Sequence, residues 1–200
     1  MAAVTESVVR EYFEALGYLV SQPRKYVLPG KPKTAEEEID FVIENPRITK
    51  HEITTNTLLW TTEDFSRVAR AVVGVVGWHT DRFYARTFDQ EPEILRFARP
   101  RSIRYAERML GSTAIAKVLC LPRLPASKAL LEKSLTVLKR RGVDGVVTFD
   151  RMLVELVFRT DTKRNYEKSD ILQVIRLLKI HGLLSNDQLE LFAPRRRRKG

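Results

Sequence analysis

Apolar and polar residues recur along the start of the chain with spacings that predict a helix followed by a strand. Residues 5–16 have a candidate N-cap at Thr5 and a stop signal at Gly17, directly after them. Their apolar positions fall on one side of a helix: Val8, Val9, Tyr12, Phe13 and Leu16. Residues 18–28 follow as a first strand, which Pro23 interrupts.

The next part of the chain predicts further strands. Residues 36–44 and 48–56 alternate in polarity on either side of a short reversal. Residues 61–75 open with a capping pattern typical of a helix, but they continue into valines that favour a strand. Residues 81–88 are expected to add another short strand.

The second half alternates between helix and strand. Helices are expected at 100–111, 126–142, 150–160 and 169–184, and strands at 113–122 and 144–149. The last helix has an apolar side that either closes the core or joins a homodimer. A helix, antiparallel strands and then alternating helices and strands predict an α/β or α+β sandwich around one sheet.

Composition indicates the number of domains and the compartment, but not a function. Two hundred residues, 44% of them hydrophobic, suit one domain with a substantial core. The single cysteine, Cys120, cannot form an internal disulfide, which favours a reducing compartment such as the cytoplasm. The longest apolar run, residues 71–78, is too short to span a bilayer, so no membrane partner is expected.

Charge points toward a polyanionic partner. The chain carries a net charge of +10, and half of it lies in the tail Arg195, Arg196, Arg197, Arg198 and Lys199. Such a tail attracts nucleic acid without reading its sequence, although it would also serve as a solubilising end. Arg101, Arg104 and Arg108 recur at helical spacing and form a candidate track for phosphates; the alternative is an ordinary solvated face.

Two acidic residues in the expected strands form a candidate metal site. If residues 45–47 make a three-residue loop, Asp40 lies directly opposite Glu52 on one face of the sheet. Carboxylates so placed repel each other unless a cation lies between them, and Mg²⁺ is a suitable one. The alternative is that both are exposed acids on a solvated sheet face.

The order of elements resembles the restriction-endonuclease-like PD-(D/E)xK nuclease superfamily over residues 4–121, with "EIDFVI" as its aspartate strand. The resemblance implies an α/β fold: a restriction-endonuclease-like core of helix, three mostly antiparallel strands, helix and strand. That core would occupy residues 1–125, followed by a C-terminal helical extension (126–192) and a basic tail (193–200). In that superfamily an aspartate and a glutamate hold Mg²⁺, and a lysine steadies the attacking water.

The resemblance makes Asp40 and Glu52 the candidate catalytic metal ligands. The lysine position falls on Thr54, which cannot supply a positive charge, so Lys50 on the same face is the candidate substitute. Glu38 and Gln22 are further candidates by position. Another alignment takes "VVGVVGW" (72–78) as the third strand and places Gly74 and Val76 at the acid and lysine positions.

Three functions are compatible with these patterns. The first is a nucleic-acid-binding protein, with DNA as the expected partner, that acts as a Mg²⁺-dependent endonuclease through Asp40 and Glu52. The second is an inactive nuclease relic that serves as a DNA-binding or protein-assembly module. The third is a protein-interaction domain, in which the tail and the arginine stripe only promote solubility.

Overall fold

The fold is built on one mixed sheet of five strands. In the computed structural model, residues 2–23, 34–53, 57–77 and 82–184 are described. The strands are β1 (Leu19–Ser21), β2 (Phe41–Glu44), β3 (Arg70–Val75), β4 (Ala116–Leu121) and β5 (Gly145–Thr148), and they lie side by side in chain order. β2 pairs antiparallel with both β1 and β3, whereas β3, β4 and β5 are parallel. The expected α/β class is therefore confirmed.

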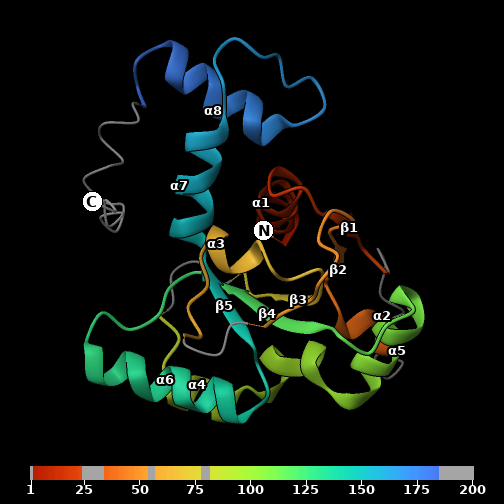
Figure 1. Ribbon diagram of the computed structural model, residues 1–200. Coiled ribbons are helices and arrows are strands. Elements are labelled where there is room, and N and C mark those ends of the chain that lie inside the picture. Colours follow the sequence, from red (N-terminus) through yellow and green to blue (C-terminus); the bar gives the residue numbers. More distant parts are fainter. Residues whose placement is uncertain (1, 24–33, 54–56, 78–81, 185–200) are drawn as a thin grey trace, which may run out of the picture.

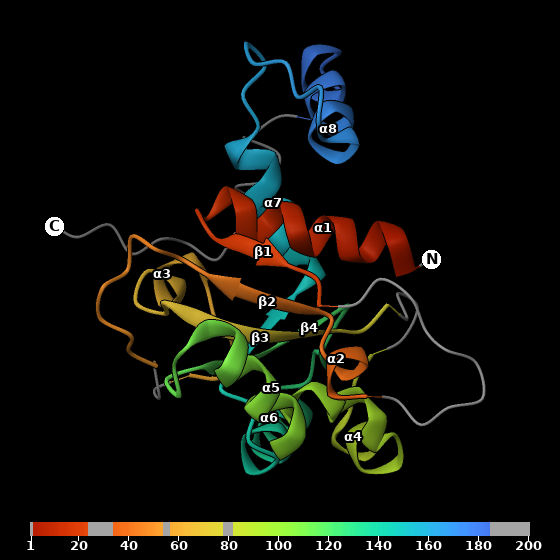
Figure 2. The ribbon, with the colours of Figure 1, turned by 90° about the vertical axis from the view of Figure 1, so that its right-hand side faces the viewer.

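Helices cover both faces of this sheet (Figures 1 and 2). One face is covered by α1 (Ala2–Ala15), α3 (Thr62–Phe65) and α7 (Phe149–Arg159). The other is covered by α4 (Ala85–Gln90), the 3₁₀ helix η1 (Pro92–Ala98), α5 (Pro100–Leu110) and α6 (Lys128–Arg140). The short helix α2 (Ala35–Glu38) leads into β2, and α8 (Asp170–Ile180) lies beyond the end of α7.

Alternation along the strands divides the core into two layers. Ala71 and Val73 of β3 pack with the α1 and α7 side chains, while Val72 between them packs with the α5 and α6 side chains. β4 follows the same rule, with Cys120 in the first layer and Leu119 in the second. None of the helices in the described residues is long and apolar enough to cross a membrane.

The prediction of a strand at 48–56 is wrong for the residues of that range that the structure describes. Residues 48–53 form no strand, and 54–56 lie outside the described residues. Asn45 donates its backbone N–H to Ala69 O and accepts the Arg47 N–H through its side chain, so the chain turns out of the sheet there. The valine-rich strand β3 pairs with β2 in the place expected for residues 48–56, and Phe41 lies opposite Val73. The strand expected at 81–88 is also wrong, because α4 begins at Ala85.

Candidate functional site

Asp40 lies at the corner where β2 begins and β3 ends. Its backbone N–H bonds to Val73 O, and its side chain is only 16% exposed. One carboxylate oxygen accepts the Val75 N–H at 2.7 Å, and the other accepts Nη2 of Arg96 at 3.2 Å. Burial raises the pKa of Asp40 more than Arg96 and the Val75 N–H lower it. Both oxygens of this carboxylate thus have partners within the chain.

Glu52 lies at the other end of β3, which corrects the expected carboxylate pair. Its backbone N–H bonds to Arg67 O, before β3 begins, whereas Asp40 contacts Val75 at the end of β3. Six residues of strand span about 16 Å, far more than two metal–oxygen bonds of about 2 Å can bridge. The prediction failed because its register assumed a three-residue hairpin loop that the chain does not make.

Lys50, the candidate substitute for the catalytic lysine, lies beside Glu52 rather than beside Asp40. Its Nζ is 2.5 Å from Glu52 Oε1, and this hydrogen bond lowers the pKa of Glu52. Both side chains are exposed, so the pair contributes little to stability. Thr54, at the family's lysine position in the first alignment, lies outside the described residues.

Beside Asp40, β3 and the residue after it have neither an acid nor a lysine at the two positions where the nuclease superfamily has its second acid and its lysine. Gly74 and Val76 occupy them, as in the alternative alignment. A Cβ atom added at Gly74 would lie 2.2 Å from the ring of Phe97, so a buried aromatic ring fills the space of a side chain there. The nearby carboxylate that sequence reasoning missed is Glu6 of α1, whose charge also raises the pKa of Asp40.

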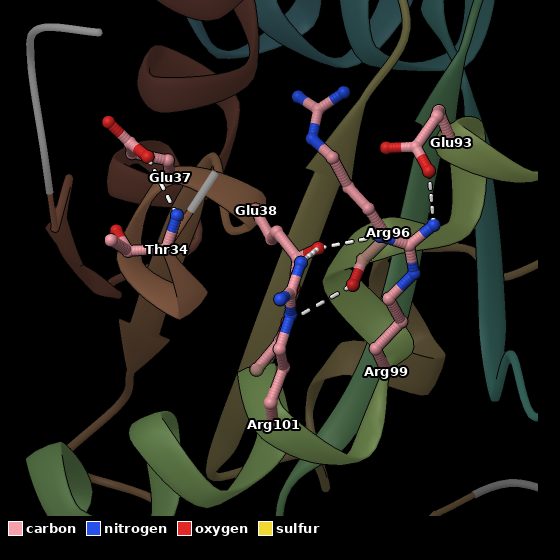
Figure 3. Close-up of polar contacts among 8 residues, drawn as sticks. Thr34, Glu37, Glu38, Glu93, Arg96, Arg99 and Arg101 are labelled. Carbon is pink, nitrogen blue, oxygen red and sulfur yellow. Dashed lines mark hydrogen bonds and ion pairs between the residues drawn. The ribbon is translucent and has the colours of Figure 1, made fainter. Parts of the chain in front are cut away.

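Glu38, a candidate by position, is completely buried and joins α2 to the start of α5 (Figure 3). Its carboxylate accepts bonds from Arg101 Nε at 2.7 Å, Arg99 Nη1 at 2.6 Å and Ser102 Oγ at 2.7 Å. Burial alone would raise the pKa of Glu38, but the bonds from Arg101, Ser102 and Arg99 outweigh it and lower the pKa to about 2.

This cluster changes the interpretation of the arginine stripe. Arg101 bonds to Glu38 and Arg99 bonds to both Glu38 and Glu93, so neither is a free phosphate ligand. In Figure 3 both converge on Glu38, while the guanidinium of Arg96 points away from them. Arginines spaced along a helix do not reveal from sequence that a distant buried glutamate will bind them.

The helices on the two sides of the sheet differ in charge. α4, η1, α5 and α6 carry nine basic and four acidic residues, whereas α1, α3 and α7 carry three basic and seven acidic residues. Within the part of the chain that the structure describes, seven exposed cations of the first group have no ion-pair partner. We call them the basic face: Arg86, Arg104, Arg108, Lys128, Lys133, Lys139 and Arg140.

On the opposite side, two of the three basic residues of α1, α3 and α7 form ion pairs with acids of the same helix. Arg10 pairs with Glu14 in α1, and Arg159 pairs with Glu155 in α7. The expected tail residues Arg195–Lys199 lie outside the described residues, as does the tail as a whole. Of the arginine stripe, Arg104 and Arg108 therefore belong to the basic face and Arg101 does not.

Metal-binding geometry is not found in the described segments. Among those residues, no group of three or more His, Cys, Asp or Glu side chains is arranged to hold an ion. His51 has its Nδ1 bonded to the backbone N–H groups of Ala69 and Arg70, which fixes the turn into β3. Comparison of the chain with protein-family models, with curated proteins and with solved structures finds no match.

Proposed function

We propose that the protein binds nucleic acid through the phosphate backbone, using the basic face. The observation that carries the proposal is the separation of charge between the two sides of the sheet. Seven exposed cations without ion pairs lie on α4, α5 and α6, and the helices α1, α3 and α7 on the other face carry more acidic than basic residues. Cations already held by a carboxylate gain little from a phosphate, whereas unpaired ones release counterions from the polyanion when they bind it.

The framework supports the same proposal. Helix, three antiparallel strands, helix and a fourth strand parallel to the third follow in the order that the nuclease resemblance implies. At the corner of that framework, however, Asp40 is bonded to Arg96, and the positions of the second acid and the lysine hold Gly74 of β3 and Val76 directly after it. The proposed activity is accordingly binding without hydrolysis.

The test is the salt dependence of binding to a duplex DNA, measured by fluorescence anisotropy. Lys139→Gln/Arg140→Gln removes two charges from the basic face, and each lost phosphate contact should lower the slope of log K against log salt by about 0.9. The matched control, Lys163→Gln/Lys168→Gln, removes two exposed charges from the segment between α7 and α8.

We expect the slope to fall for the first variant and to stay unchanged for the control. Both variants should be measured with and without residues 195–199, because the tail adds its own contacts. Equal losses in the two variants would mean that only net charge matters and would overturn the proposal. The absence of binding at physiological salt would do the same.

A second candidate, a Mg²⁺-dependent phosphodiesterase, is favoured by Glu6, whose charge raises the pKa of Asp40 at the sheet corner. The two carboxylates would hold the ion once Arg96 releases Asp40 and Gln22, whose Nε2 donates to Glu6 Oε2 at 3.0 Å, gives way. This candidate predicts cleavage of DNA in Mg²⁺ or Mn²⁺ that disappears in Asp40→Asn and Glu6→Gln. The Glu52→Gln variant is the matched control and should cut as the unchanged chain does.

A further inference from the structure

The outer surface of α8 carries no charge beyond its first residue. Its exposed positions after Asp170 are Val174, Leu177, Ile180, His181, Gly182 and Leu183, counting the turn that follows the helix. The aliphatic members are 54%, 44%, 48% and 67% exposed. In a chain with 30% charged residues, an exposed surface without charge is typical of a protein–protein interface.

The two cations of α8 are used on its inner side. Lys179 Nζ donates to Val157 O at 3.0 Å and to Thr160 O at 2.7 Å, at the end of α7. Arg176 Nε donates to Thr162 O at 3.1 Å. These bonds satisfy carbonyls at the C-terminal end of α7 and fix α8 against it. They also hold the charged groups away from the apolar outer surface.

The inner apolar residues of α8 already have partners. Ile171, Leu172 and Ile175 pack with the core layer that contains α1 and α7. The helix lies beyond α7, on the far side of the molecule from α4, α5 and α6 (Figures 1 and 2). No other described element lies over its outer surface, so the exposed side chains there are not part of the core.

We propose that this surface pairs with the same surface of a second copy of the chain. A twofold axis brings identical patches together, so a charged patch would meet its own charge. The chain is strongly basic, and this uncharged surface avoids that repulsion. In an antiparallel pair of α8 helices, the positive N-terminal end of each helix dipole lies beside the negative C-terminal end of the partner helix, which favours this orientation.

The pairing is expected to be of low affinity. Eleven residues of helix are about 16 Å long, so the contact falls below the 1,200 Å² or so that stable complexes usually bury. The experiment is therefore a concentration series of the full chain, from about 1 to 200 µM, followed by sedimentation velocity. We expect the mass to rise from one chain toward two as the concentration increases.

Two variants test the surface itself. Leu177→Glu and Leu183→Glu each place like charges at the proposed twofold contact and should leave one chain at every concentration. Leu183 is two-thirds exposed, so its substitution leaves the core intact. The matched control is Leu19→Glu, which changes an equally exposed leucine on β1 and should associate as the unchanged chain does. Circular dichroism checks that each variant is folded.

The proposal is overturned by either of two results. One is a single-chain mass for the unchanged protein at all concentrations, which would leave the surface to a different partner or to another part of this chain. The other is an association that persists in both α8 variants. Because the readout is mass rather than nucleic-acid binding, failure here leaves the proposed function standing.

Discussion

Glu38 is the residue whose environment departs most from what its type implies. A glutamate is rarely buried without compensation, and here two guanidinium groups and a hydroxyl provide it. Arg99 lies between η1 and α5 and Arg101 lies in the first turn of α5, so the glutamate joins that layer to the start of β2. Removing the charge would leave Arg99 and Arg101 without their shared partner.

The pKa of Glu38 makes this role measurable. The pKa of the Glu38 carboxyl is lowered to about 2 in the folded chain. The charged carboxylate therefore stabilises the fold above about pH 4.5, and this stabilisation is lost as the pH falls toward 2. We expect Glu38→Gln to lower the free energy of unfolding by about 2 kcal/mol at neutral pH, because it removes the charge that binds Arg99 and Arg101. The loss is no larger because both arginines are partly exposed to water.

The difference between Glu38→Gln and the unchanged chain should shrink steadily from pH 5 to pH 2 in urea titrations. Glu132→Gln, on the exposed side of α6, is the control and should differ little from the unchanged chain at neutral pH. A difference that stays constant over that range would show that the charge of Glu38 is not what stabilises the fold.

Among the elements, the helices were the easiest to predict. The expected ranges 100–111 and 126–142 agree with α5 and α6 to within two residues at each end. Long segments with periodic apolar positions, proline at the start and glycine after the end determine such helices locally. The strands β4 and β5 were also found, because each is a short apolar run between helices.

β3 and the carboxylate pair could not be settled from the sequence. Residues 48–56 alternate like a strand, and the true β3 reads as the continuation of a helix. Which of the two pairs with β2 depends on tertiary contacts, such as the Phe97 ring that packs against Gly74. The position of Glu52 depended on that choice, so an error in one element moved a candidate site residue to the other end of the sheet.

Gly74 gives a test of this packing at the level of the strand. An added Cβ would meet the fully buried Phe97 ring, so Gly74→Ala should lower the free energy of unfolding by about 3 kcal/mol. Gly77→Ala is the control, because its Cβ would first meet Thr5 Oγ1 at an ordinary 3.4 Å. Both are measured by urea denaturation.

The double variant Gly74→Ala/Phe97→Leu should recover part of the loss, since the smaller side chain frees the space beside β3. Equal effects of Gly74→Ala and Gly77→Ala would contradict this account. The same contact explains why the corner beside Asp40 has no room for a glutamate at position 74 unless η1 moves.

At the scale of the molecule, the two proposed surfaces lie at opposite ends. The basic face is on α4, α5 and α6, and the uncharged surface of α8 lies beyond α7 on the other side of the sheet. A twofold pair through α8 would therefore place its two basic faces outward and away from each other. A pair built in this way binds two separate duplexes more readily than it clasps one.

This arrangement predicts that the protein bridges DNA molecules. With one duplex fixed to beads and a second labelled duplex in solution, the unchanged chain and Leu19→Glu should both retain the label. Leu177→Glu should bind single duplexes with unchanged affinity, because its basic face is intact, but it should retain no label above the protein-free level. Retention by Leu177→Glu would mean that one copy carries two binding surfaces, and loss of its single-duplex affinity would place α8 in the DNA contact itself.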